Sequence, residues 1–451
     1  MDHVDVFVVG GGPAGSSITV DLAEAGLTVA MAERDRLGGE CTNYGCVPSK
    51  ALLKAGRLAA QARRSDRYGI RIPQVRVDFP AVMERVRGLI AGMVAAGTTP
   101  FEERGARVFN QEARIAGDHR VELADETRIE ADRIVLSTGT DPAVPPVPGL
   151  EEGGFWTNKD AVDLDALPGS LAILGAGAVG VEFAQIFARF GVDVTLIEAL
   201  DGVLPGEDPE ISAALEEVLE AEGIRTMAGA RMDRAERRGS GWELAMADGT
   251  EIKSDELLVA TGRRQVLQVH DLDGAGVKVD ERGNPVLTET LRTSNPNIWV
   301  TGDATGDLMF VHVNGHKADV VVDDILGRPH PVDYRIAPRV TFCEPEVASV
   351  GLTEDQAREE GIDVVTAVTR FEDDERSQIE GETAGLVKLV ADERTGEVVG
   401  GHIMGEHAGE MIGEVLTSMA TRARPATIGW AIHPYPTRSQ TLQGAFRALD
   451  R

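Results

Sequence analysis

Two cysteines, Cys41 and Cys46, stand close together in the stretch GGECTNYGCVPSK, residues 38–50, and only one other cysteine, Cys343, occurs in the chain. Three uses are conceivable for such a pair: a zinc site, a structural disulfide or a redox couple. A structural zinc site usually has a second Cys or His pair at short spacing, and the sequence offers none. A disulfide that closes so short a loop adds little stability. Redox chemistry is therefore the favoured use.

The geometry of a reversible disulfide is consistent with this use. Residues five apart in a straight helix are separated by about 7.5 Å along its axis, whereas a disulfide needs Cα atoms within about 6.8 Å. Pairing therefore requires a distorted turn, which Gly39, Gly45 and Pro48 can supply. A helix is predicted from Pro48 onward, so Cys46 would lie beside a helix N-terminus, where a thiolate is stabilised. Two buried thiols without a redox role remain the alternative.

Two glycine turns with the pattern G-x-G-x-x-G each follow an apolar run and open a helical pattern. An acidic residue, Glu33 in one copy and Glu198 in the other, lies 23 positions after the first glycine of its copy. The glycines are Gly10, Gly12 and Gly15 in the first copy and Gly175, Gly177 and Gly180 in the second. Such a turn brings backbone N–H groups to a pyrophosphate, and the acid accepts hydrogen bonds from a ribose. Two bound dinucleotides are therefore predicted.

The acid of the second copy also bears on which nicotinamide cofactor binds. A carboxylate at Glu198 would repel the 2′-phosphate of NADP(H). The sequence therefore favours NAD(H), with NADP(H) as the less favoured alternative.

The length of 451 residues requires several domains. The predicted fold class is α/β, with two Rossmann-like dinucleotide-binding domains and a C-terminal α+β domain. Apolar strands run into Thr138-Gly139, Gly262 and Gly302-Asp303, and a proline-rich linker follows the first of them. The predicted domain limits are 1–148 and 269–334 for the two parts of the first binding domain, 149–268 for the second binding domain, and 335–451 for the C-terminal domain.

Composition excludes several classes of partner. The net charge of −29 opposes binding to nucleic acid or to an anionic membrane. No signal peptide and no apolar run long enough to span a bilayer are visible, so a cytoplasmic location is expected. No resident metal site is predicted. Lysines number 7 against 38 arginines, which is consistent either with life at high salt or with a GC-rich coding bias.

The cysteine stretch resembles the redox-active motif of the class I pyridine nucleotide–disulfide oxidoreductases. The likeness extends to both glycine turns, the Thr-Gly segments, TGDATG, EVASVGLTE and the C-terminal HPYPTRSQ. It implies FAD in the first site, NAD in the second, and a homodimer formed through the C-terminal domain.

The resemblance also implies roles for individual residues. Cys46 would contact the flavin and Cys41 would attack the acceptor, while Lys50, paired with Glu182, would lie near the flavin. The remaining implied cofactor contacts are Thr138, Gly139 and Asp303 for FAD and Gly262 for NAD.

The C-terminal segment departs from the family pattern. Disulfide reductases of this family have a His followed five positions later by Glu, which together move a proton. Tyr435 and Gln440 occupy those positions here, and His433 lies two residues early. Tyrosine has a pKa near 10 and is a poor base at neutral pH. His433 is therefore either a substitute base or a structural residue.

The predicted function is that of an FAD-dependent NAD(P)H:disulfide oxidoreductase, most like dihydrolipoyl dehydrogenase, that acts on a small disulfide. The first alternative is a reductase of a metal ion, quinone or other electrophile, similar to mercuric reductase. A non-catalytic flavoprotein subunit is the lesser alternative. Cys343 is expected in the core. His312 and His316 are expected to pack at the start of a helix, and contact with the flavin ring is the alternative.

Overall fold

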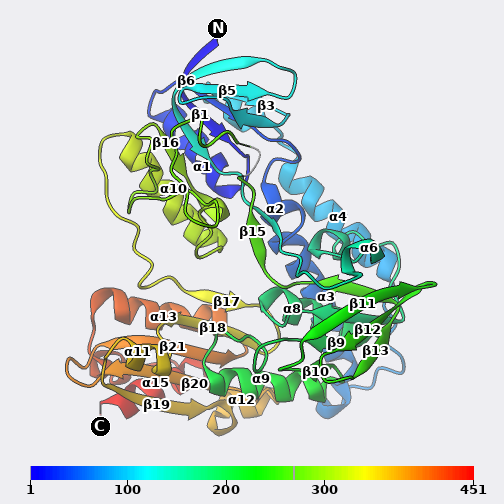
Figure 1. Cartoon of the computed structure of the whole chain (residues 1–451). Helices are drawn as coiled ribbons and strands as arrows, with labels where there is room; N and C mark the ends of the chain where they lie inside the picture. The colour runs from blue at the N-terminus through cyan, green and yellow to red at the C-terminus, as the bar shows by residue number, and fades with distance from the viewer. Residues whose placement is uncertain (1, 268–269, 451) are drawn as a thin grey trace. The chain divides into compact units, whose positions relative to one another are not determined.

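The computed structural model describes residues 2–267 and 270–450 of the chain (Figure 1). The backbone forms two compact units that alternate along the sequence. The first unit comprises Met1–Pro48, Glu84–Ala143 and Arg263–Tyr334, and the second comprises Ser49–Met83, Val144–Gly262 and Arg335–Arg451. The predicted domain limit between residues 268 and 269 lies outside the described residues. The other predicted limits stay predictions.

The first unit is built on a seven-stranded sheet. Its strand order is β3-β2-β1-β6-β5-β4, and β16 also pairs with β6. β1, β2, β3, β6 and β16 run parallel, and β4 and β5 join them in antiparallel pairs. The strands are β1 (Asp2–Val9), β2 (Val29–Ala32), β3 (Arg107–Phe109), β4 (Ala113–Ile115), β5 (Arg120–Leu123), β6 (Arg128–Leu136) and β16 (Ile298–Val300). A separate two-stranded ladder joins β7 (Thr140–Pro142) to β15 (Arg263–Gln265).

Both faces of this sheet are buried, which explains the unbroken apolar run of β1. Val6 and Val8 pack with α1 (Pro13–Glu24) and α10 (Val311–Ile325) on one face. Phe7 belongs to a separate core on the other face. A parallel sheet covered on both sides requires such runs. The chain runs from β1 through the glycine turn to α1 and then to β2, which confirms the predicted strand–turn–helix–strand order of the first copy (Figure 1).

The second unit contains the second copy of that order. A parallel sheet has the strand order β10-β9-β8-β14, and α8 (Ala178–Phe190) comes after β8. An antiparallel sheet of order β11-β12-β13 lies between β10 and β14 in the sequence. The strands are β8 (Ser170–Leu174), β9 (Asp193–Ile197), β10 (Arg225–Met227), β11 (Met232–Arg238), β12 (Gly241–Met246), β13 (Glu251–Ser254) and β14 (Glu256–Val259).

The C-terminal part of the second unit is an antiparallel sheet of order β17-β18-β21-β20-β19. α13 (Ala408–Thr421) and α15 (Ser439–Leu449) bury Val415 and Phe446 against it, as the predicted α+β domain requires. The strands are β17 (Arg339–Thr341), β18 (Glu346–Gly351), β19 (Val364–Arg370), β20 (Leu386–Asp392) and β21 (Val398–Gly405).

The remaining helices connect these sheets. α3 and α4 each begin in one unit and end in the other. The remaining α-helices are α2 (Gly39–Asn43), α3 (Cys46–Arg63), α4 (Phe79–Val94), α5 (Thr99–Glu102), α6 (Leu150–Gly153), α7 (Asn158–Ala161), α9 (Pro209–Ala221), α11 (Glu354–Glu359), α12 (Glu375–Glu380) and α14 (Pro425–Gly429). The short 3₁₀ turns are η1 (Ser65–Tyr68), η2 (Gly302–Thr305) and η3 (Phe371–Asp373).

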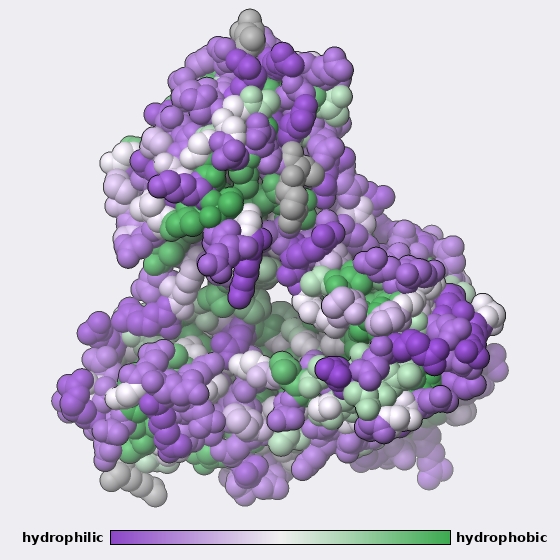
Figure 2. All heavy atoms as spheres, in the orientation of Figure 1, coloured by the Kyte–Doolittle hydropathy of each residue, from purple (hydrophilic) through white to green (hydrophobic). Residues whose placement is uncertain are grey.

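The surface in view is mostly hydrophilic (Figure 2), in keeping with the high charge of the sequence. Within residues 2–267 and 270–450, no helix has the length and apolar character needed to cross a bilayer.

A buried lysine connects β20 to two other elements of the second unit. Lys388 is 4% exposed and its Nζ lies 3.0 Å from Asp208 Oδ2, 2.9 Å from Glu210 Oε1 and 3.1 Å from Glu354 Oε2. Asp208 is itself fully buried and caps α9 by accepting a hydrogen bond from the Glu210 amide. The ammonium and its carboxylates therefore depend on one another for neutralisation.

Replacing Lys388 by methionine is expected to destabilise the C-terminal sheet by about 3–5 kcal/mol, because it leaves the buried Asp208 carboxylate without its cation. Native-state hydrogen exchange of the β20 and β21 amides measures this loss. Lys253→Met is the matched control, because Lys253 pairs with Glu243 at the surface and such pairs contribute about 1 kcal/mol or less. Equal effects of the two substitutions would contradict the assignment.

Candidate functional site

The first glycine turn brings β1 and α1 into backbone contact. Gly10 has φ +106°, and a Cβ there would lie 2.2 Å from the Ser137 carbonyl oxygen. A Cβ at Gly15 would lie 2.0 Å from the Gly10 carbonyl oxygen. Only glycine fits either position. Gly12 is the N-cap residue of α1, so the predicted turn opens a helix N-terminus, which is a site for a phosphate.

Glu33 lies at the end of β2, where the sequence predicted a ribose-binding acid. Its Oε2 accepts a hydrogen bond from the Gly11 amide at 2.7 Å, and its Oε1 accepts one from the Asp35 amide at 2.8 Å. The carboxylate is therefore held beside the glycine turn by two backbone donors.

The second copy repeats this arrangement. Gly175 has φ +103°, and a Cβ at Gly180 would lie 1.8 Å from the Gly175 carbonyl oxygen. Gly177 is the N-cap residue of α8. Glu198 Oε2 accepts a hydrogen bond from the Ala176 amide at 2.7 Å, and Oε1 accepts one from the Leu200 amide at 2.9 Å. The two predicted dinucleotide sites thus share one hydrogen-bond pattern.

Some buried polar side-chain atoms of the first unit lack a hydrogen-bond partner among the described residues. Thr138 Oγ1, Thr301 Oγ1 and Asn314 Oδ1 have none among the described residues. Thr138 and Gly139 follow β6, and Asp303, whose Oδ1 accepts a hydrogen bond from Asn314 Nδ2 at 2.6 Å, follows β16. Such atoms are normally completed by a polar ligand or by ordered water. These residues fit FAD as the group that completes them.

The two cysteines lie on two helices with a break between them. Cys41 is in α2 and Cys46 is the first residue of α3, two positions before the helix start predicted at Pro48. Between them, a Cβ at Gly45 would lie 3.2 Å from the Glu40 carbonyl oxygen and 3.4 Å from Cys41 Cα. The backbone is therefore folded tightly over the Tyr44-Gly45 break, which is the distortion that the spacing predicted. Both cysteines are half-buried.

An ion pair next to Cys41 was missed from the sequence. Arg263 Nη2 lies 3.2 Å from Glu40 Oε1. Arg263 also donates to Thr140, through Nε to Oγ1 at 2.6 Å and through Nη2 to the carbonyl oxygen at 2.9 Å. The charge of Glu40 beside the cysteine was visible in the sequence, but its distant partner was not. This pair fixes α2 to the β7–β15 ladder.

Lys50 and Glu182 come together in the second unit, as predicted. Lys50 Nζ donates to Glu182 Oε2 at 2.7 Å, and Glu182 Oε1 accepts a hydrogen bond from the Phe342 amide at 2.9 Å. The Lys50 ammonium also lies 4.8 Å from the centroid of the Phe342 ring, within the range of a cation–π contact. Glu182 is 4% exposed, so the pair holds Lys50 in a fixed place. No motif in the sequence pointed to Phe342.

The C-terminal segment places the ring of His433 between two acceptor oxygens of the chain. His433 Nε2 lies 2.8 Å from Glu414 Oε1, and Nδ1 lies 3.1 Å from the Ala431 carbonyl oxygen. Both ring nitrogens therefore meet acceptors of the same subunit. Tyr435 is 70% exposed. Gln440 Oε1 accepts a hydrogen bond from the Thr437 amide at 3.4 Å.

Three minor candidates also have a place in the structure. Cys343 is 1% exposed and lies in the core, as expected, and burial raises the pKa of its thiol. His312 and His316 lie in the first turns of α10, where His312 stacks on Phe310 with ring centroids 5.6 Å apart. His316 Nε2 accepts a hydrogen bond from the Asp333 amide at 3.2 Å.

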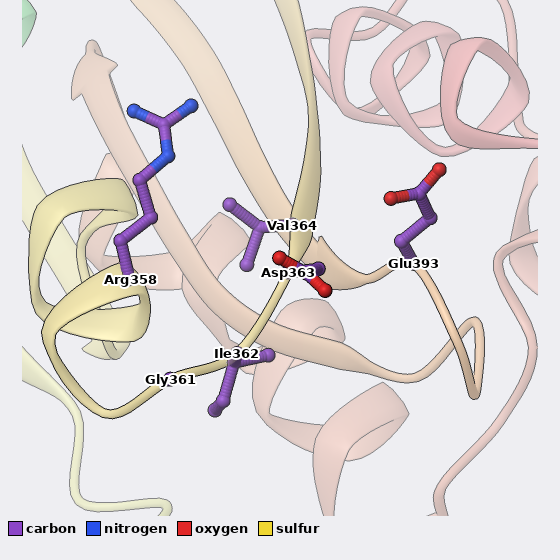
Figure 3. A pocket seen from close by; sticks show the side chains of 6 residues that line it. All are labelled: Arg358, Gly361, Ile362, Asp363, Val364 and Glu393. Atoms are coloured by element: carbon purple, nitrogen blue, oxygen red, sulfur yellow. The ribbon is translucent and has the colours of Figure 1, made fainter.

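A pocket in the C-terminal sheet region contains none of the predicted site residues. It lies between the end of α11 and the start of β19, close to the turn after β20 (Figure 3). Its lining residues are Arg358, Gly361, Ile362, Asp363, Val364 and Glu393. Within the described part of the chain, no group of three or more His, Cys, Asp or Glu side chains is placed to hold a metal ion.

Comparison with known families gives two matches that together span most of the chain. A family model described as pyridine nucleotide-disulphide oxidoreductase matches residues 4–318. The model of the dimerisation domain of that family matches residues 337–446, which supports a homodimer.

Individual relatives are similar over nearly the whole chain. The chain is 33% identical over 452 residues to mercuric reductase of Staphylococcus aureus, covering 99% of this chain and 82% of that protein. It is 34% identical over 464 residues to dihydrolipoyl dehydrogenase 3 of Pseudomonas putida, covering 100% and 99%. The solved structure of the HOCl-induced flavoprotein disulfide reductase RclA of Escherichia coli is 28% identical, with a TM-score of 0.89 and coverage of 98% and 99%. A Cu(II) complex of RclA has a TM-score of 0.88.

Glu198 is expected to make the protein prefer NADH to NADPH, because its carboxylate repels a 2′-phosphate. Glu198→Gln removes the charge and should lower the NADH-to-NADPH ratio of kcat/KM by about tenfold, which corresponds to about 1.4 kcal/mol. Rapid-mixing measurement of flavin reduction gives this ratio. Glu33→Gln, the same change in the first copy, should leave the ratio of the FAD-loaded protein unchanged. A wild-type protein that reacts equally with both cofactors would refute the assignment.

Proposed function

The chain belongs to the pyridine nucleotide-disulphide oxidoreductase family, and we propose that it passes electrons from NADH through bound FAD and the Cys41–Cys46 pair to a soft metal ion. The members of this family related to it use FAD and NAD(P)H. The observation that carries the choice of acceptor is that both ring nitrogens of His433 already contact acceptor oxygens of the chain.

The residues of the chain divide the work in this proposal. The two glycine turns bind the pyrophosphates, and Glu33 and Glu198 bind the riboses. Bound FAD supplies the two-electron chemistry between nicotinamide and thiol. Cys46, at the first turn of α3, has its thiolate stabilised by the helix N-terminus. Lys50, fixed by Glu182, adds a positive charge on the same helix, four residues after Cys46.

The two kinds of acceptor differ in their need for protons. Reduction of a disulfide by NADH takes up one proton and yields two thiols. Reduction of a divalent metal ion to the metal, or of two Cu(II) ions to Cu(I), releases one proton for each NADH oxidised. In the metal reaction the reduced cysteine pair returns to the disulfide as its two electrons leave. A proton donor close to the acceptor is therefore essential only for the disulfide reaction.

The C-terminal segment fits the reaction that needs no proton donor. His433 contacts acceptors at both nitrogens, and its carboxylate partner is Glu414, 19 positions before it. Tyrosine is a poor base at neutral pH, and Gln440 is a neutral amide. The His and Glu of the family's disulfide reductases are therefore absent from positions 435 and 440. Thiolates, in contrast, are the ligands that soft metal ions prefer.

The names of two relatives support the same choice. One relative at 33% identity is a mercuric reductase, and the RclA flavoprotein has been solved as a Cu(II) complex. A small disulfide remains the second candidate acceptor, because dihydrolipoyl dehydrogenase 3 is 34% identical over the whole chain. A flavoprotein without catalytic activity is least favoured, because both glycine turns are present and the two cysteines lie on either side of a tight backbone break.

We expect the purified protein to oxidise NADH about tenfold faster or more with mercuric or cupric ion than with lipoamide. Absorbance at the NADH band gives the rates, and a pH indicator in weak buffer counts protons, with a Cu(I) chelator present in the cupric assay. One proton released per NADH is expected. An equal or higher rate with lipoamide, with proton uptake, would establish the disulfide acceptor instead. Cys41→Ser is the control and should abolish turnover with either acceptor.

The double variant Tyr435→His, Gln440→Glu is expected to raise the lipoamide rate, because it restores the His and Glu of the family's disulfide reductases. A gain of about tenfold is expected, which is less than the usual contribution of about 10²–10⁴-fold from general acid–base catalysis. His433→Gln is the matched control and should change neither rate by more than about twofold, because both ring nitrogens already contact acceptors within the chain. A lipoamide rate unchanged in the double variant, or lost in His433→Gln, would contradict the proposed division of roles.

A further inference from the structure

Lys317 is a fully buried lysine in the first unit, outside the residues that the sequence singled out. It lies on α10, next to Ala318 and about one turn before Val321. Both of those residues belong to the core that α10 shares with β1 and α1. A buried ammonium is costly unless hydrogen-bond acceptors surround it. Its position therefore indicates a specific use.

The acceptors of Lys317 all come from the segment 302–308, which follows β16. Nζ donates to Thr305 Oγ1 at 2.8 Å, to the Leu308 carbonyl oxygen at 3.0 Å and to the Gly302 carbonyl oxygen at 3.3 Å. It also forms an ion pair with Asp307. Gly306 and Asp307 are exposed, so apolar burial does not hold this part of the turn. The Lys317 ammonium holds it, together with Gln265, whose Nε2 donates to the Ala304 carbonyl oxygen at 2.7 Å.

Asn314 fixes the other side of the same turn. It lies three residues before Lys317, on the same face of α10, and its Nδ2 donates to Asp303 Oδ1 at 2.6 Å. Asn314 is 7% exposed and Thr301 is fully buried. Asn314 Oδ1 and Thr301 Oγ1 have no hydrogen-bond partner within the described ranges. The Lys317 ammonium thus has its acceptors within the turn. Near Asp303, in contrast, Asn314 Oδ1 and Thr301 Oγ1 lack a partner among the described residues.

We propose that Lys317 is a positioning residue and Asn314 a binding residue of the FAD site. Lys317 holds the turn 302–308, Asn314 orients the Asp303 carboxylate, and polar groups of bound FAD complete the hydrogen bonds of Asn314 Oδ1 and Thr301 Oγ1. This inference rests on the assignment of FAD to the first unit and is independent of the acceptor.

The test measures FAD affinity of the apoprotein by quenching of flavin fluorescence. Lys317→Met should weaken FAD binding by about tenfold or more, because it releases the turn that carries Asp303. Lys278→Met, the same change at an exposed lysine of the first unit, should alter the affinity by less than about twofold. An affinity of Lys317→Met within twofold of the wild type would overturn the proposal.

A double-mutant cycle separates positioning from general stabilisation. If Lys317 acts through Asp303, then Lys317→Met should weaken FAD binding much less in an Asp303→Asn background than in the wild type. Multiplicative losses, together with an unchanged FAD-induced rise in melting temperature, would show a merely structural lysine and overturn the proposal.

Asp307→Asn keeps the test usable if Lys317→Met does not fold. It removes one exposed partner of the ammonium and should weaken FAD binding by about threefold or more, and unchanged affinity would count against the proposal. Asn314→Leu should weaken FAD binding by at least as much. Failure of the wild-type apoprotein to bind FAD would instead refute the assignment of the cofactor to this unit. If the protein proves not to reduce a metal ion, the expected FAD affinities of all these variants stay the same.

Discussion

The close approach of backbone at the two glycine turns is the constraint on which both cofactor sites depend. A side chain at Gly15 or Gly180 would collide with the carbonyl oxygen of the first glycine of its turn, at 2.0 Å and 1.8 Å. This approach places each helix N-terminus directly after its parallel strand and brings the acid of the next strand within hydrogen-bond distance of the turn. The places of the two proposed cofactor sites are therefore set by backbone geometry at the glycine turns.

Because these constraints are local, they could be predicted from sequence. The spacing from the first glycine to Glu33 or Glu198 reflects one strand–helix–strand passage, and the structure contains that passage twice. The same holds for the cysteines, since a glycine and a proline within a few residues predict a break and a helix start. The helix begins at Cys46 and not at Pro48, because the first turn of a helix accepts a proline.

Contacts between distant segments could not be predicted from spacing, and the Lys50–Glu182 pair was expected only from the family resemblance. Arg263 reaches Glu40, Glu414 reaches His433, and Lys317 reaches the turn after β16 only because the fold brings separate elements together. For His433 the sequence showed an imidazole two residues from the expected place, but not what its nitrogens would contact. Periodicity and spacing describe one element at a time, whereas these roles depend on packing between elements.

The exposed segment around Tyr435 is less constrained by packing within the chain than the buried Glu182 is. Ile432 and Tyr435 are 100% and 70% exposed, so substitutions in this segment disturb few contacts within the subunit. Glu182, in contrast, is buried between Lys50 and the Phe342 amide. Relatives of 33% and 34% identity over nearly the whole chain accordingly bear names for different reactions. In the proposed function, a few exposed side chains change the acceptor while the path from nicotinamide to thiol stays the same, so overall identity does not distinguish the two reactions.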